Sequence, residues 1–187
     1  MSIRVLGGTY RGRQLGSVPG TGTRPLLGQV KQALFNILAS EVPDARVWDL
    51  FAGTGATGIE ALSRGAASVL FVERDPKALK VLKANLGLFD LEEGVQFEVL
   101  RGNAWSPPAG DKAPDLIFLD PPYEQVQRDP AGSLESAARL QERLAAGGRV
   151  IFHFPRGVLT EKSLEPLGSV DLRHFGGAAV ALIRAAP

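Results

Sequence analysis

Short apolar runs alternate along this chain with segments whose hydrophobic residues recur at helical spacing. From Gln29 the apolar positions fall on one face of a predicted helix, which Pro43 ends. Beyond it, apolar runs bounded by turn residues indicate strands. The predicted strands are 46–51, 69–73, 95–100, 116–119, 149–154, 170–175 and 179–184.

The segments between these runs are typical of helices. Asp75 and Pro76 form a strong helix start, because the carboxylate suits the N-cap and proline suits the first turn. A second long helix is predicted over 133–146, ended by Gly147. Strands that alternate with helices predict an α/β fold: a Rossmann-like, mostly parallel sheet, with the last two strands as an antiparallel hairpin.

The chain begins with a basic segment that lacks this alternation. Residues 1–40 carry five basic groups and no carboxylate, whereas the other 147 residues carry 16 basic and 20 acidic groups. We therefore expect an N-terminal arm or hairpin over 1–28 and one domain over 29–187. Such an arm suits a polyanionic partner. Arg11 and Arg13 flank Gly12, so both are expected to face one side of an extended strand.

The composition narrows the class of protein. Hydrophobic residues make up 44% and charged residues 22% of the 187 residues, a globular balance. The absence of cysteine excludes disulfides and thiolate chemistry. The longest apolar stretch, 178–183, is too short to span a bilayer, and no secretory signal is visible. We therefore expect a cytoplasmic protein. No metal site is expected, because His153 and His174 lie in ordinary strand-like runs without other metal-ligating residues at a recognisable spacing.

A glycine loop follows the first strand of the predicted sheet. Gly53, Gly55 and Gly58 occupy the spacing of a dinucleotide fingerprint between a strand and a helix. Glu73 stands 20 residues after Gly53, at the end of the next strand, where a carboxylate can accept hydrogen bonds from ribose hydroxyls. An adenosine-containing cofactor is indicated, and both NAD and S-adenosylmethionine fit this pattern.

The segment Asp120-Pro121-Pro122-Tyr123 favours the second cofactor. It follows a buried strand, where an open α/β sheet places its chemistry. Asp120 and the Pro121 carbonyl supply acceptors for an amine, and Tyr123 supplies a face on which a base can stack. Such acceptors offset the positive charge that develops when an exocyclic amine attacks a methyl group.

Residues 49–58 together with 120–123 resemble the class I, S-adenosylmethionine-dependent amino methyltransferases. The longer stretch 49–66 is closely similar to the RsmD family, which methylates a guanine N2 in 16S ribosomal RNA, and residues 4–13, 24–25 and 33–38 resemble its arm and first helix. One departure lies at 26–29, where Leu-Leu-Gly-Gln replaces the family's usual polar residues.

The resemblance implies a role for each matching residue. Asp49, Gly53 and Gly55 would contact the methionine part of the cofactor, Glu73 its ribose, and Asn103 the region of its adenine. The residues implied to receive the target amine and base are Asp120, Pro121 and Tyr123. The basic residues expected to bind 16S rRNA, or an assembling small subunit, are Arg11, Arg13 and Arg24. The protein is expected to act as a monomer.

Several readings remain open on the sequence alone. The same chemistry could act on adenine N6 in DNA or on a protein glutamine. An NAD-dependent oxidoreductase and a non-catalytic RNA-binding module are rivals from other classes. Trp105 is interpreted as a packing residue that could also stack on a base, and Arg128 and Asp129 as part of a loop, either plain or one that closes over substrate.

Overall fold

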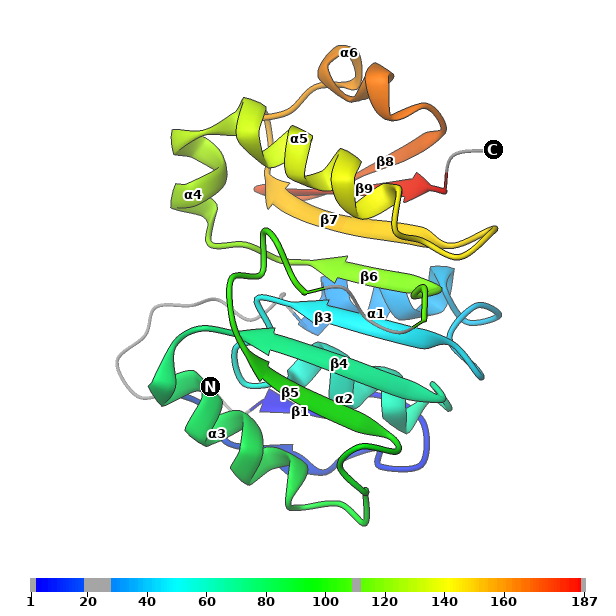
Figure 1. The fold of residues 1–187 in the computed structure, drawn as a ribbon, viewed down its shortest axis with the longest axis vertical. Helices are drawn as coiled ribbons and strands as arrows, with labels where there is room; N and C mark the ends of the chain where they lie inside the picture. Colours follow the sequence, from blue (N-terminus) through cyan, green and yellow to red (C-terminus); the bar gives the residue numbers. More distant parts are fainter. Residues whose placement is uncertain (1–2, 19–27, 109–111, 186–187) are drawn as a thin grey trace. The chain divides into compact units, whose positions relative to one another are not determined.

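The computed structural model describes residues 3–18, 28–108 and 112–185. The chain divides into two compact units, Met1–Ala104 and Trp105–Pro187. Figure 1 shows helices and strands alternating through both. In this division the basic N-terminal segment is part of the first unit, and the expected domain boundary after residue 28 stays a prediction.

The first unit contains three parallel strands, and a small hairpin precedes them in the chain. β4 pairs with β3 on one side and β5 on the other, in register from Arg46 opposite Ser68 to Glu73 opposite Arg101. The elements in chain order are β1 (Ile3–Arg4), β2 (Gln14–Leu15), α1 (Gly28–Ile37), β3 (Arg46–Leu50), α2 (Ala56–Ser63), β4 (Ser68–Glu73), α3 (Pro76–Leu86) and β5 (Phe97–Arg101).

The start of α3 confirms the predicted cap. Asp75 is the N-cap, and its carboxylate accepts hydrogen bonds from the amides of Lys77 and Ala78, while Pro76 occupies the first turn. The helix then buries a leucine stripe against the strands, with Leu82 fully buried and Leu86 nearly so. Local capping and burial on one face together account for this helix.

The second unit joins parallel and antiparallel strands. β6 pairs in parallel with β7, and β9 then pairs antiparallel with both β7 and β8. The elements are β6 (Leu116–Leu119), α4 (Tyr123–Arg128), α5 (Pro130–Gln141), β7 (Arg149–Pro155), α6 (Glu161–Leu164), the 3₁₀ helix η1 (Glu165–Leu167), β8 (Val170–Phe175) and β9 (Ala178–Arg184).

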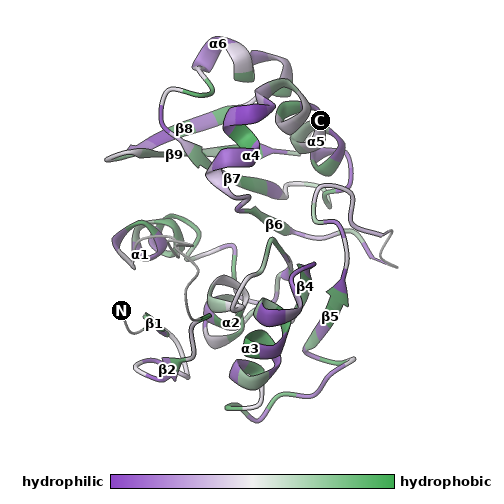
Figure 2. Cartoon of the chain, turned by 90° about the vertical axis from the view of Figure 1, so that its left-hand side faces the viewer, coloured by the Kyte–Doolittle hydropathy of each residue, from purple (hydrophilic) through white to green (hydrophobic). Residues whose placement is uncertain are grey.

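Strand β9 lies between β7 and β8, although it follows both in sequence. Every residue of β9 except Arg184 is buried, whereas each residue of β8 is half-buried or exposed. Figure 2 shows the same contrast, with stretches of purple along β8. The antiparallel C-terminal hairpin and the mostly parallel strands confirm the predicted Rossmann-like fold class.

Several element boundaries differ from the prediction. α5 begins at Pro130, because Asp129 caps it by accepting a hydrogen bond from the Gly132 amide at 2.9 Å. The expectation of a loop is wrong for Arg128, which ends α4; Asp129 is the single residue that links α4 to α5, and it caps α5. Within the described ranges, no helix is both long enough and apolar enough to cross a bilayer.

Candidate active site

The three glycines of the loop after β3 meet different surroundings. Gly53 and Gly55 have φ of +56° and +78°, a region that favours glycine. A Cβ on Gly55 would lie 2.2 Å from Leu82 Cδ1, and one on Gly58 would lie 2.3 Å from Phe71 Cε1. Gly55 and Gly58 therefore permit close packing, whereas a Cβ on Gly53 would meet nothing nearer than 3.9 Å. Gly53 is the glycine with open space beside it.

Asp49 fixes the helix that follows this loop. Its carboxylate is buried and accepts a hydrogen bond from the Gly58 amide at 2.8 Å. The N-cap residue of α2, Gly55, has no capping side chain. Asp49 therefore satisfies the Gly58 amide in place of a capping side chain, and it links the end of β3 to the first turn of α2.

The Glu73 carboxylate, at the end of β4, accepts hydrogen bonds from three backbone amides. One carboxylate oxygen accepts from Gly53 at 2.9 Å, and the other accepts from Arg74 at 2.7 Å and Asp75 at 2.9 Å. A carboxylate offers about four acceptor positions, so about one remains for a ligand hydroxyl. That position, together with the open side of Gly53, fits the ribose of an adenosine-type cofactor.

Asn103 lies two residues beyond β5, where its side chain is exposed. The neighbouring Gly102 amide donates to the Glu73 carbonyl oxygen at 3.1 Å, which joins the ends of β5 and β4. The expected cofactor residues thus belong to the first unit, at the carboxyl ends of β3, β4 and β5 or in the loops directly after them. The structure brings Gly53 and Glu73 into direct contact.

The segment expected to receive the amine, residues 120–123 and called the amine-binding segment below, belongs to the second unit. Asp120 follows the last residue of β6, Pro121 is buried, and Pro122 adopts an extended conformation, with φ −54° and ψ 133°, before α4. Tyr123 opens that helix and is half-buried. The two prolines thus turn the chain from strand into helix and keep Asp120 and Tyr123 close in space.

His153 joins the two polar ends of this segment. Its Nδ1 lies 2.6 Å from Asp120 Oδ1, and its Nε2 lies 2.9 Å from the Tyr123 hydroxyl. The imidazole and phenol rings meet edge to face, with centroids 5.3 Å apart. The sequence interpretation of His153 as an ordinary strand residue is therefore incomplete: it contacts both residues implied to receive the amine and base.

Strand register could have identified His153. β6 and β7 are parallel, and Leu119 pairs with Phe152. The next residue on each strand is Asp120 and His153, so the two side chains emerge together at the carboxyl ends of neighbouring strands. Both strands were predicted from the sequence, but their relative register was not.

Helix α4 is held against β7 by further contacts. The Trp105 indole donates to the Gln125 side-chain oxygen at 2.9 Å and meets the Phe152 ring at right angles, with centroids 6.5 Å apart. Val126 on the same helix is fully buried. Trp105 therefore packs within the second unit, the role the sequence favoured for it.

The basic arm is firmly attached to α2 in the first unit. Glu60 is fully buried, and its two oxygens accept from the amides of Leu6 and Gly7, each at 2.8 Å. Ion pairs join the same carboxylate to Lys31 at 3.2 Å and to Arg64 at 2.8 Å. Burial lowers the pKa of Lys31, and the nearby Glu60 charge opposes that change. Sequence reasoning missed this cluster, although a carboxylate within the apolar run of α2 was its signal.

Arg11 and Arg13 are exposed, but not on one side of an extended strand. Residues 9–12 form a turn, in which Gly12 has φ +86° and its amide donates to the Val5 carbonyl at 2.9 Å. The expectation of an extended strand is wrong, because the glycine that separates the two arginines is used to reverse the chain. Arg24 and the first part of the departure at 26–29 lie outside the described residues.

Comparisons with known proteins identify the family of this chain. The family model described as conserved hypothetical protein 95 matches residues 3–184. Ribosomal RNA small subunit methyltransferase D of Escherichia coli (strain K12) is 39% identical over 141 residues, which cover 75% of this chain and 67% of that protein. The candidate rRNA methyltransferase YlbH of Bacillus subtilis (strain 168) is 42% identical over 127 residues, 66% of this chain and 68% of that protein.

Solved structures show the same fold. The candidate methyltransferase yhhF of Escherichia coli is 29% identical and has a TM-score of 0.78, with 99% of this chain and 98% of that chain covered. A 16S rRNA N2 methyltransferase of Thermus thermophilus, solved with S-adenosylmethionine and guanosine, has a TM-score of 0.75 over all of this chain and 50% of that chain; at 19% identity it shows the shared fold. The chain is a member of the RsmD family of class I, S-adenosylmethionine-dependent methyltransferases.

Proposed function

We propose that this protein transfers a methyl group from S-adenosylmethionine to the exocyclic N2 amine of a guanine in 16S ribosomal RNA. The observation that carries the proposal is the Asp120 carboxylate, which follows β6 and is held by His153 at 2.6 Å. Family membership supports the methyl transfer. The small-subunit RNA methyltransferase named among its relatives supports the choice of ribosomal RNA.

Asp120 is proposed to make the amine reactive. The lone pair of an exocyclic amine is delocalised into the ring, so the free amine is a poor nucleophile. When bound, S-adenosylmethionine supplies an electrophilic methyl group on a positively charged sulfur. His153 engages Oδ1 of Asp120, which leaves Oδ2, together with the Pro121 carbonyl, to accept hydrogen bonds from the amine. These acceptors offset the developing positive charge, and Asp120 takes the proton that the methylated amine releases.

Tyr123 is proposed to hold the base. Its ring is half-buried, and its hydroxyl is fixed by His153 at 2.9 Å, so one face of the ring can stack on a guanine. A base must leave its helix to reach such a site, and sequence-specific RNA recognition mostly uses unpaired bases. We therefore expect the target guanine to lie in a loop, or to be flipped out of its stack.

The first unit is proposed to bind the cofactor. Glu73 would accept from a ribose hydroxyl, and Gly53 would allow close approach of the methionine part. Gly55, packed on Leu82, would contact that part through its backbone, and Asp49 would hold the loop through its bond to the helix. Asn103 would lie near the adenine. The bonds from the Gly53, Arg74 and Asp75 amides to Glu73 support this assignment, because they fix the carboxylate before any ligand arrives.

The arm is proposed to bind RNA. Arg11 lies in the turn over 9–12, and Arg13 directly follows it; both are exposed. The amides of Thr9 and Tyr10 in that turn donate to Ser63 of α2, and exposed guanidinium groups on such a fixed support suit phosphate contacts. Arg24 completes the proposed set. The partner is 16S rRNA, either free or within an assembling small subunit.

A nucleoside assay tests this proposal. The purified chain is incubated with methyl-labelled S-adenosylmethionine and either 16S transcript or small subunits that lack the modification, and the RNA is digested for mass spectrometry. The expected product is N2-methylguanosine, lost when Asp120 is replaced by Ala. Label in DNA adenine or in protein glutamine, with none in RNA guanine, contradicts the substrate. Calorimetry that shows tight NAD binding and no S-adenosylmethionine binding contradicts the whole assignment.

A further inference from the structure

We propose that His153 is a positioning residue: a single imidazole ring sets both the carboxylate that accepts from the amine and the aromatic ring that stacks on the base. The inference rests on the function proposed above and adds a residue to it. All three side chains belong to the second unit, so the inference depends only on contacts within that unit.

The contacts are short and partly shielded from water. Nδ1 lies 2.6 Å from Asp120 Oδ1, and Nε2 lies 2.9 Å from the Tyr123 hydroxyl. The His153 side chain is 8% exposed and that of Asp120 is 28% exposed. The imidazole therefore lies beneath the segment, while the carboxylate still reaches solvent. A hydrogen bond to a charged group in such a setting is among the stronger ones in proteins.

The chemistry of the two partners fixes the tautomer. An ionised carboxylate can only accept hydrogen bonds, so Nδ1 must carry the proton that points at Asp120. In the neutral ring, Nε2 then has a lone pair and accepts from the Tyr123 hydroxyl. Two hydrogen bonds then run in the same direction: the Tyr123 hydroxyl donates to Nε2, and Nδ1 donates to the Asp120 carboxylate. Rotation of either partner would break one of these bonds.

The strand beneath His153 supplies the rigidity that this role needs. β7 is paired with β6 on one side and with β9 on the other, where His153 lies opposite Val180. Its neighbours Phe152 and Phe154 are fully buried. A group on a central strand holds its partners more closely than a group on a loop, and small displacements of catalytic groups are costly.

Two substitutions separate the two bonds. The side-chain nitrogen of Asn lies near the place of Nδ1, so His153→Asn keeps a donor for Asp120 and loses the Tyr123 bond. The amide of Gln reaches the place of Nε2, so His153→Gln keeps a partner for Tyr123 and loses the Asp120 bond. Tyr123→Phe removes the hydroxyl alone and should match His153→Asn. His174→Gln is the control, because His174 is the other histidine and is exposed on β8.

Steady-state methyl transfer is measured for each variant with 16S substrate. His153→Gln is expected to lower kcat by about ten- to a hundredfold, with KM for RNA within about threefold, because a bond to a charged group that works in the reaction is lost. His153→Asn and Tyr123→Phe are expected to raise KM for RNA by about three- to tenfold, with kcat within about threefold. His174→Gln should match the wild type.

Equal losses in kcat and KM for both His153 variants, or activity of both within about threefold of wild type, overturn the proposal. If the variants fail to fold, nitrogen NMR of the ¹⁵N-histidine-labelled wild type still decides it. The expected signal is an Nδ1-protonated ring with a slowly exchanging proton, and an Nε2-protonated neutral ring overturns the inference. Failure of the wild type to methylate any RNA guanine contradicts the proposed function instead, and the NMR result is read independently.

Discussion

Glu60 in the first unit and His153 in the second are both buried polar side chains that join several partners, and they differ in what they join. Glu60 in the first unit accepts from the backbone amides of Leu6 and Gly7 and pairs with Lys31 and Arg64. His153 in the second unit joins two side chains of the amine-binding segment. The comparison teaches that the partners, rather than burial, distinguish a group that joins backbone segments from one that contacts the residues proposed to act in the reaction.

Removal of the Glu60 carboxylate should have the largest effect on stability. Glu60→Ala leaves the Lys31 charge buried without its partner and leaves two arm amides unsatisfied, so we expect a loss of about 3–5 kcal/mol in the free energy of unfolding. Chemical denaturation of the full chain, followed by circular dichroism, measures this. Glu142→Ala, at an exposed position just after α5, is the matched control. A loss as small as that of the control would show that Glu60 is not what holds the arm.

Removal of the Asp120 carboxylate should have the largest effect on the reaction while the fold is kept. Asp120→Ala is expected to lower the rate of methyl transfer by about a hundred- to a thousandfold, because a preorganised electrostatic group is lost. Affinity for S-adenosylmethionine, measured by calorimetry, should stay within about twofold of wild type, since the proposed cofactor residues are elsewhere in the chain. A rate within about threefold of wild type would remove Asp120 from the reaction.

Glu73 should affect cofactor affinity more than stability. Glu73→Ala removes the proposed acceptor for a ribose hydroxyl, so we expect affinity for S-adenosylmethionine to fall by about ten- to a hundredfold. The control is Glu98→Ala, an exposed carboxylate on the neighbouring strand β5. Calorimetry with both variants decides the matter, and equal affinities for the two would exclude a ribose contact by Glu73.

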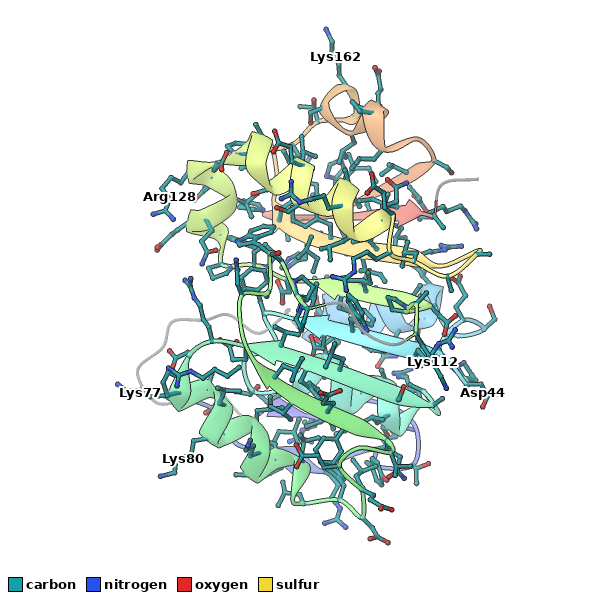
Figure 3. The ribbon with its side chains drawn as sticks, viewed as in Figure 1. Asp44, Lys77, Lys80, Lys112, Arg128 and Lys162 are labelled. Atoms are coloured by element: carbon teal, nitrogen blue, oxygen red, sulfur yellow. The ribbon has the colours of Figure 1, made fainter. Side chains whose placement is uncertain are left out.

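The arm should change how RNA binding depends on salt. Each phosphate contact contributes slightly less than one unit to the slope of log affinity against log salt, so replacing Arg11, Arg13 and Arg24 by Ala should flatten that slope by up to about three units. Lys77 and Lys80 of α3 provide the control positions, since both are exposed and Figure 3 shows their side chains extending outward from the helix. Their double replacement by Ala should leave the slope unchanged in filter-binding measurements. The opposite ranking of the two variants would place the RNA contact on α3 instead.

Features set by neighbouring residues were predictable from the sequence. The cap at Asp75, the glycine loop and the predicted strands, apart from the start of β5, agree with the structure, because each depends on neighbours in the chain. The start of α5 was missed although the same Asp-Pro signal stands at Asp129 and Pro130. α4 was missed because two prolines before it indicated a loop and the helix has only six residues.

Features that depend on pairing between distant segments were not predictable in this way. Val95 suits a strand by type, but it is 61% exposed, and β5 begins only at Phe97. The roles of His153 and Glu60 required, respectively, the register of two strands and the position of the arm on α2. Hydrophobic pattern alone determines neither of these arrangements.

The placement of β9 has a consequence for the order of events during protein synthesis. β9 pairs with β7 and β8, yet the ribosome makes it after both of them. Until β9 emerges, one edge of β7 offers unpaired amides and carbonyls to any passing strand, and nascent chains on neighbouring ribosomes could pair there. The strand that supports His153 is thus among the last to be enclosed, and the amine-binding segment acquires its support only late in the emergence of the chain.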